Sequence, residues 1–326
     1  MKKKTRTHAR NLAALAVLAL ALNTGAQAAE IDSIHFLIPG GAGGGWDGTA
    51  RGTGEALTKA GIVGNASYEN MSGGGGGKAI AHIIETSEKA QNTLMVNSTP
   101  IVIRSLQGVF PQSFRDLTPV AGTIGDYAAM VVNTDSELSS MSGLMTAFNA
   151  DSTKVAIGGG SVAGGMDHLV AAMVMKSGGA DPTKVKYIPY DAGGKAMAGL
   201  LSGEIQALST GLGEALDLQK QGQVRILCVT SAERLADASD VPTCKEQGND
   251  TEFVNWRGFF GPPGLSEEKQ AAYLVALEKM YATDEWETVR ARNGWVNIFT
   301  PGGEFVGFLE LQEAVIGGLM KELGFL

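Results

Sequence analysis

The chain has 326 residues and a formal net charge of −8. Five of its basic residues fall within positions 1–28, which contain no acidic residue, so the remainder carries 21 Lys and Arg against 34 Asp and Glu, a net charge of −13. Such an acidic chain is poorly suited to bind nucleic acid, whose phosphates attract Lys and Arg. The remaining length suits about two domains.

Residues 1–28 have the pattern of a secretory signal peptide. A basic start precedes an apolar stretch at 12–22, which is too short to span a bilayer comfortably, and small residues at 26–28 favour cleavage before Ala29. The first cysteine is Cys228, so no lipid-attachment cysteine follows the apolar stretch. We therefore expect a soluble periplasmic protein that is not a lipoprotein.

Apolar runs then alternate with segments of helical periodicity, which predicts an α/β fold. The predicted strands span 34–38, 93–97, 120–123, 128–132, 155–158, 185–189, 207–210 and 225–229. The predicted helices span 46–60, 78–87, 141–150, 165–177, 193–202, 214–221 and most of the chain from 267 onward.

A pattern of strand, glycine burst and helix occurs twice, at 36–51 and at 155–170. This echo indicates two lobes that each present a helix N-terminus, a favourable place for an anion, to a shared cleft. We expect the chain to cross between the lobes near 128–133 and 253–260. The predicted domains are residues 29–130 and 254–326 for the first lobe and 131–253 for the second.

The glycine motifs do not fit nucleotide-binding loops. Residues 43–48 formally match G-x-G-x-x-G, but the bulky Trp46 stands where a pyrophosphate would approach. The SGGGGGK run at 72–78 has Ser72 in place of the first P-loop glycine and is followed by Ala79 instead of Ser or Thr. We expect no cofactor, and we interpret the glycine bursts as loops that bind a different ligand.

A serine hydrolase is a weaker alternative. The GGSVA segment at 159–163 resembles a G-x-S-x-G elbow around Ser161, but Ala163 replaces the last glycine. Asp167 and His168 follow closely, whereas triad partners normally come from distant loops. No His, Cys and Asp cluster has the spacing of metal ligands, so no metal site is expected.

The two cysteines leave two alternatives open. Cys228 lies in an apolar run that predicts a buried strand, and Cys244 lies at the start of a predicted helix. In an oxidising compartment they would form a disulfide or stay as two buried thiols, and the sequence gives no distance between them.

Several long motifs occur in the order seen in one known family. They are IHFLIPGGAGGGWDGTAR at 34–51, NMSGGGGG at 70–77, NST at 97–99, YIPYDAGGKAMAGLLSG at 187–203, VRILCVTSAERLADASDVPTCKEQG at 224–248 and NWRGFFGPPGL at 255–265. The chain resembles the substrate-binding proteins of tripartite tricarboxylate transporters, the TctC or Bug family. Cys228 and Cys244 stand in a segment where that family usually has aliphatic residues.

The resemblance implies a two-lobed, type II periplasmic-binding-protein fold with two hinge crossings and no catalysis. It implies a monomer that captures a small di- or tricarboxylate and delivers it to a membrane permease. Trp46 tilts the expectation toward citrate-like acids. A sensor that presents its carboxylate to a two-component receptor kinase would use the same cleft, and the sequence does not separate the two roles.

The candidate ligand-binding residues come from these loops. They are Gly41, Gly43, Gly44, Trp46, Asp47, Ser72, Gly74, Ser98, Thr99, Ser161, Gly164, Gly165, His168, Tyr190, Asp191 and Thr210. One carboxylate is expected on Gly43, Gly44 and the Trp46 amide, with Asp47 fixing the loop or capping the helix. A second is expected on Ser161, Gly164 and Gly165. Because the glycine loops lack basic residues, we expect no basic side chain to hold the ligand.

Overall fold

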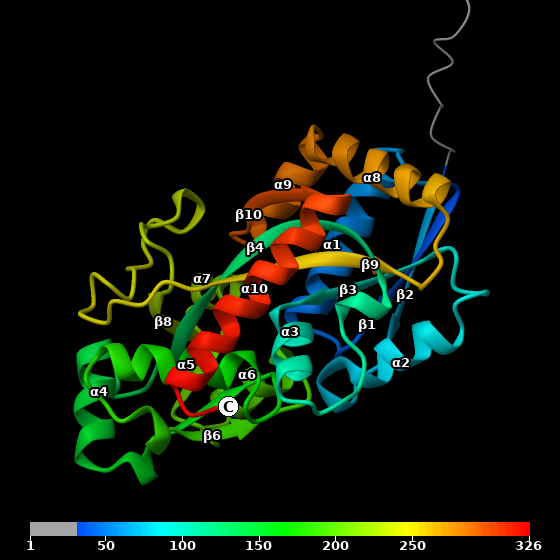
Figure 1. Cartoon of the computed structure of the whole chain (residues 1–326). Helices are drawn as coiled ribbons and strands as arrows, with labels where there is room; N and C mark the ends of the chain where they lie inside the picture. The colour runs from blue at the N-terminus through cyan, green and yellow to red at the C-terminus, as the bar shows by residue number, and fades with distance from the viewer. Residues whose placement is uncertain (1–30) are drawn as a thin grey trace, which may run out of the picture.

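A computed structural model describes residues 31–326, so the predicted signal peptide lies outside the described residues. Its strands join into one ten-stranded sheet with helices packed around it (Figure 1). The strands are β1 (Ser33–Ile38), β2 (Asn65–Asn70), β3 (Thr93–Ser98), β4 (Thr118–Asn133), β5 (Ala156–Gly159), β6 (Lys186–Pro189), β7 (Ala207–Gly211), β8 (Val224–Val229), β9 (Val254–Gly261) and β10 (Val296–Pro301).

The helices fill the connections between these strands. They are α1 (Gly45–Lys59), the short 3₁₀ turn η1 (Gly74–Gly76), α2 (Gly77–Glu85), α3 (Thr99–Leu106), α4 (Met141–Ala150), α5 (Met166–Ser177), α6 (Gly193–Leu201), α7 (Leu212–Lys220), α8 (Glu267–Tyr281), α9 (Asp284–Arg292) and α10 (Gly302–Glu322). Further 3₁₀ turns lie at Phe114–Asp116, Ser152–Lys154, Pro182–Lys184 and Ala236–Ala238.

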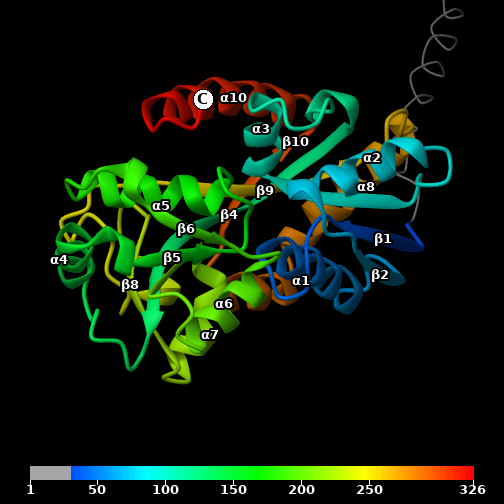
Figure 2. The same cartoon turned by 90° about the horizontal axis from the view of Figure 1, so that it is seen from below.

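The sheet has two halves that share the long strand β4 (Figures 1 and 2). In the first half β1 pairs in parallel with β2 and β3, and β9 lies antiparallel between β3 and β4. In the second half β5 pairs in parallel with β6 and β7. The N-terminal part of β4 pairs with β9 and β10, and its C-terminal part pairs with β7 and β8. Strand β4 is therefore a crossing between the halves.

The sequence predicted two strands where the structure has one. Residues 120–123 and 128–132 both belong to β4, and the glycine- and aspartate-containing stretch between them continues the strand. The interpretation of a break is wrong because Asp126 is buried and paired, not solvated as a loop aspartate would be. The second predicted crossing, 253–260, coincides with β9, which is a fully paired strand.

Helix α10 contacts both halves of the molecule (Figure 2). It packs on α3 in the first half, and the residues at its C-terminal end reach α5 in the second. Lys176 Nζ lies 2.6 Å from Glu322 Oε1, and the Phe325 ring meets the His168 ring edge-on at a centroid distance of 4.8 Å. The end of the chain, which we expected to belong to the first lobe alone, thus also contacts α5.

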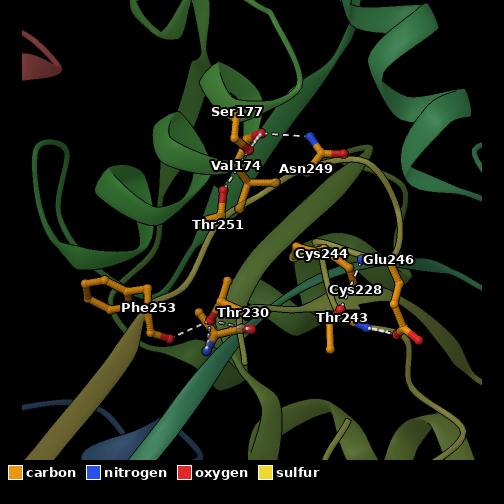
Figure 3. Close-up of a disulfide and its surroundings, with 11 residues drawn as sticks. Val174, Ser177, Cys228, Thr230, Thr243, Cys244, Glu246, Asn249, Thr251 and Phe253 are labelled. Atoms are coloured by element: carbon orange, nitrogen blue, oxygen red, sulfur yellow. Dashed lines mark hydrogen bonds between the residues drawn. A yellow bond between two sulfur atoms is a disulfide. The ribbon is translucent and has the colours of Figure 1, made fainter. Parts of the chain in front are cut away.

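The structure contains a disulfide between Cys228 and Cys244 (Figure 3). Cys228 lies in β8, as expected, but Cys244 lies in a turn and not in a helix. The Cys244 amide donates to the Val229 carbonyl, which holds the turn against the end of β8. The predicted helix at Cys244 is wrong because this backbone pairing with β8 replaces the intrahelical hydrogen bonds.

Candidate functional site

A cavity of about 150 Å³ lies between the two halves. Its lining includes first-turn residues of four helices, α1, α3, α5 and α6, and the glycine turn η1. The first amides of a helix have no intrahelical partner, and the helix dipole makes that end electropositive. Several such ends around one cavity form an environment suited to an anion.

The helices at the cavity start without a side-chain cap. Residues Gly44, Ser98, Gly165 and Ala192 precede α1, α3, α5 and α6, and none of them accepts a capping hydrogen bond with its side chain. Helices α4, α8 and α9, whose first residues do not line the cavity, are capped by Ser140, Ser266 and Thr283. The ends of α1, α3 and α6 at the cavity are therefore not capped by local side chains, whereas the Ser161 hydroxyl accepts from the Asp167 amide in the first turn of α5.

Asp47 holds the first glycine loop in shape. Its carboxylate accepts hydrogen bonds from the Gly43 amide at 3.0 Å, from Arg51 at 2.8 Å and from the Asn70 side chain at 3.0 Å. Asp47 lies inside α1, so it is not the N-cap residue, which is Gly44. Because the Gly43 amide already donates to Asp47 and Gly43 does not line the cavity, its predicted contact with a carboxylate is not supported.

The second glycine loop is fixed by its own hydrogen bonds. The Ser161 hydroxyl accepts from the Asp167 amide at 3.0 Å, and the Tyr187 hydroxyl donates to the Ser161 carbonyl at 2.7 Å. The Gly164 amide donates to His168 Nδ1. Gly164 and His168 thus brace the loop and do not line the cavity.

The hydrolase alternative requires a histidine that contacts the Ser161 hydroxyl. Within the described residues the hydrogen-bond partners of the Ser161 hydroxyl are Asp167 and Tyr187, and His168 is not among them. The His168 ring stacks on Tyr187 with a centroid distance of 4.5 Å, and burial lowers its pKa to about 4. A buried neutral imidazole turned toward Gly164 is not placed to activate Ser161.

The structure brings most of the predicted residues to one cavity, where their role as ligand contacts stays a prediction. The predicted residues that line it are Gly41, Gly44, Trp46, Ser72, Gly74, Ser98, Ser161, Gly165, Tyr190 and Asp191. Those outside the lining are Gly43, Asp47, Thr99, Gly164, His168 and Thr210. Trp46 Nε1 donates to the Ser98 hydroxyl at 2.9 Å, so it also joins the start of α1 to the end of β3.

Sequence reasoning missed two arginines in the cavity lining, Arg104 of α3 and Arg257 of β9. We expected no basic side chain to hold the ligand, but residues far from the glycine loops in sequence bring positive charge to the cavity wall. Arg104 Nη1 donates to Gln107, and the buried Arg104 Nε has no partner within the described residues. The buried Asn255 Oδ1, also in the lining, has none either.

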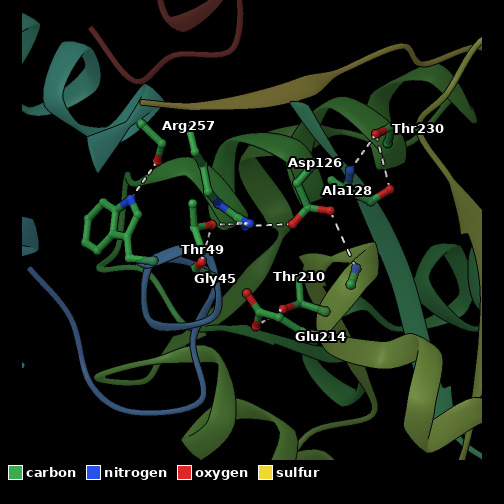
Figure 4. Close-up of polar contacts among 11 residues, drawn as sticks. Gly45, Thr49, Asp126, Ala128, Thr210, Glu214, Thr230 and Arg257 are labelled. Atoms are coloured by element: carbon green, nitrogen blue, oxygen red, sulfur yellow. Dashed lines mark hydrogen bonds and ion pairs between the residues drawn. The ribbon is translucent and has the colours of Figure 1, made fainter. Parts of the chain in front are cut away.

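Arg257 is held by a buried ion pair (Figure 4). Its Nη2 lies 2.6 Å from Asp126 Oδ2, and both side chains are at most 3% exposed. Nη1 donates to the Thr49 hydroxyl of α1 at 3.2 Å. The charged side chain in the apolar β9 segment was a sequence signal for a buried pair, but only the fold identifies Asp126 as its partner.

Two acidic residues also line the cavity, Asp167 of α5 and Glu214 of α7. Burial raises the pKa of Asp167 to about 6, against the lowering effect of hydrogen bonds with Ser161. Burial likewise raises the pKa of Glu214 to about 7, while the charge of Arg257 acts in the opposite direction. The cavity therefore combines helix ends, arginines and two carboxyl groups that titrate near neutral pH.

Comparison with known proteins gives a match to one protein family. The family described as "Tripartite tricarboxylate transporter family receptor", TctC, matches residues 50–294. The chain belongs to this family. The predicted membership in the TctC or Bug family is thereby confirmed, and residues 50–294 include parts of both halves.

Curated relatives cover most of the chain. A UPF0065 protein of Bordetella bronchiseptica is 27% identical over 238 residues, which are 71% of this chain and 69% of that protein. Protein BugT of Bordetella pertussis is 27% identical over 269 residues, 77% of this chain and 78% of that protein.

Solved structures share the fold. The periplasmic binding protein BugD has a TM-score of 0.80 at 18% identity, covering 90% of this chain and 98% of its own. MatC from Rhodopseudomonas palustris with bound malate has a TM-score of 0.75 at 19% identity, and the match covers 89% of this chain and 98% of MatC. Rpa4515 from R. palustris with adipate has a TM-score of 0.77 at 20% identity, and the match covers 90% of this chain and 97% of Rpa4515. The predicted two-lobed periplasmic-binding-protein fold is confirmed.

Among residues 31–326, no helix has both the length and the apolar character needed to cross a membrane.

Proposed function

We propose that this protein captures a small di- or tricarboxylate in the periplasm and delivers it to the membrane permease of a tripartite tricarboxylate transporter, without catalysing a reaction. The observation that carries the proposal is the set of four helix N-termini around one cavity, three of which, those of α1, α3 and α6, have no side-chain cap. Their first-turn amides are arranged to donate to carboxylate oxygens. The carboxylates bound to MatC and Rpa4515 support the same ligand class.

The two halves of the molecule suit binding by closure. Helices α1 and α3 come from the first half of the sheet, and α5 and α6 come from the second, so one ligand would contact both. A ligand that makes its full set of contacts only when the halves are close stabilises the closed form by those contacts. A permease would then distinguish the loaded form from the empty form by its shape.

Arg104 adds a charge that the helix ends alone do not provide. Its Nε is buried, lacks a partner within the described residues, and belongs to a side chain that lines the cavity. A hydrogen bond from a guanidinium to a carboxylate contributes about 1.5–3 kcal/mol, more than a bond between neutral groups. We therefore propose that Arg104 holds one carboxylate of the ligand together with the helix ends.

Isothermal titration calorimetry with citrate, tricarballylate, malate, succinate and terephthalate tests the function. At least one of these acids should bind with micromolar or tighter affinity, since about three to five hydrogen bonds of roughly 0.5–3 kcal/mol each are available. The purified protein should show no esterase turnover. Heat with none of them, together with an esterase activity that disappears in Ser161→Ala, would show that the protein is a hydrolase.

A matched pair of variants tests the role of the arginine in the same titration. Arg104→Gln should weaken the tightest ligand by about 10- to 150-fold, the equivalent of one charge-assisted hydrogen bond. Lys78→Ala should change affinity by less than about threefold, because Lys78 is exposed and does not line the cavity. Equal effects of the two substitutions would contradict a specific contact with Arg104.

A further inference from the structure

The acidic side chains in the cavity lining conflict with the proposed ligand unless they carry protons. Glu214 and Asp167 lie in the same wall as the helix ends that would hold a carboxylate. Among residues 31–326 neither carboxyl group forms an ion pair. An anion that enters the cavity therefore meets two carboxyl groups whose charges would repel it.

Glu214 is enclosed by the backbone that would contact the ligand. A Cβ atom added at Gly193 would lie 1.8 Å from Glu214 Oε2, and one added at Gly45 would lie 2.9 Å from Oε1. These glycines begin α6 and α1, so the carboxyl group fits against both helix ends only because they lack side chains. The Thr210 hydroxyl donates to Oε2 at 2.7 Å (Figure 4).

The charged groups around Glu214 do not compensate for a negative charge on it. They are Arg257 from β9, Asp126 from β4 and Asp167 from α5. Arg257 is already paired with Asp126 at 2.6 Å, so the cluster without Glu214 carries one positive and up to two negative charges. Helices α1 and α6 present glycines here, and β7 presents Thr210.

This cluster is poised to exchange a proton near neutral pH. Burial raises the pKa of Glu214 to about 7 and the pKa of Asp167 to about 6. A carboxylate bound nearby adds another negative charge, which raises the pKa of a neighbouring carboxyl group further. A protonated carboxyl group also becomes a hydrogen-bond donor for a ligand oxygen.

On the basis of the proposed function, we propose that the cleft takes up a proton together with its carboxylate ligand and that the Glu214 carboxylate accepts this proton. The balance is simple: a solvent proton adds to one Glu214 oxygen as the ligand binds, and it returns to solvent when the ligand leaves. Proton uptake on binding requires that affinity fall as the pH rises above the pKa of the free carboxyl group. The ligand class is therefore a polycarboxylate that binds more tightly in mildly acidic surroundings.

Calorimetry at pH 7.5 in two buffers of different ionisation enthalpy measures the number of protons taken up when the ligand binds. Binding of the tightest dicarboxylate should take up more than about 0.5 proton per ligand. Between pH 7 and 8.5, where the carboxylates of the free ligand stay ionised, affinity should fall by about tenfold or more. Glu214→Gln should abolish the proton uptake and flatten this pH dependence, while Glu278→Gln, at an exposed position on α8, should behave like the wild type.

Each other outcome has a defined meaning. A wild-type protein that binds a carboxylate with no proton uptake and with a pH-independent affinity would overturn the inference and leave the proposed function standing. Proton uptake that persists in Glu214→Gln and disappears in Asp167→Asn would overturn the assignment to Glu214. No binding of any carboxylate from pH 5.5 to 8.5 would overturn the proposed function and the inference with it. If Glu214→Gln fails to fold, the wild-type titration and Asp167→Asn still decide between these results.

Discussion

Replacing Asp126 with alanine should lower the free energy of unfolding by about 3–5 kcal/mol, the typical effect of removing one partner from a buried ion pair. The substitution leaves the Arg257 guanidinium buried without its carboxylate, since the pair is separated by 2.6 Å and neither side chain is more than 3% exposed. The pair lies where β4 passes from one half of the sheet to the other, because Gly125 pairs with β9 and β10 while Ala128 pairs with β7. We therefore also expect weaker ligand binding.

Chemical denaturation measures this effect, with Asp217→Ala as the matched control. Asp217 Oδ1 lies 4.0 Å from Lys220 Nζ, and both side chains are more than 60% exposed, so its loss should change stability by less than about 1 kcal/mol. The double variant Asp126→Ala/Arg257→Leu should recover part of the lost stability, because it removes the unpaired charge. Equal stability of Asp126→Ala and the control would show that the buried pair has no such role.

The substitution Gly160→Ala should weaken ligand binding by at least about 100-fold while the protein stays folded. A Cβ atom at residue 160 would lie 2.3 Å from the Gly193 amide nitrogen and 2.6 Å from the Ala192 carbonyl carbon. Because these are backbone atoms, the start of α6 must move away by about 1 Å to reach van der Waals distance. Loss of two hydrogen bonds from the displaced helix end to a carboxylate would cost about 3–6 kcal/mol of binding free energy.

The control for this variant is Gly48→Ala. Gly48 lies in α1, and a Cβ atom there would have no neighbour within 4 Å. Calorimetry should give this control wild-type affinity, and circular dichroism should give both variants wild-type secondary structure. If Gly160→Ala bound the ligand with wild-type affinity, binding would not require the close approach of the second glycine loop to α6.

The parts of the fold that were predictable from the sequence are those with local signals. The apolar run at 34–38 corresponds to β1, and the glycines after it precede α1, since a glycine-rich turn between strand and helix leaves a distinct local pattern. Strand β2 was missed because its residues are mostly exposed or half-buried, so it lacks an apolar pattern. Helix α3 was not predicted, although Pro100 near its start is a helix signal.

In the candidate site, too, the residues with local sequence signals were predictable and those placed by long-range packing were not. Residues of the glycine loops, such as Gly44 and Gly165, were identified because their motif is contiguous in sequence. Arg257 was missed because its pairing with Asp126 joins residues 131 positions apart, and nothing in the local sequence relates them. Glu214 lies in the first turn of α7, an ordinary amphipathic helix, and its proposed role depends on the approach of Gly45 and Gly193 from two other elements. Long-range packing decides these features, and one sequence does not encode it in a local pattern.

The most direct test of the carboxylate-binding account is a crystal structure of the protein with its tightest carboxylate ligand. The account predicts carboxylate oxygens within about 2.7–3.2 Å of first-turn amides of α1 and α5 and of the Arg104 guanidinium, with both halves of the protein in contact with the ligand. A ligand bound outside this cavity, or one held there by side chains without any contact to the helix ends, would contradict it.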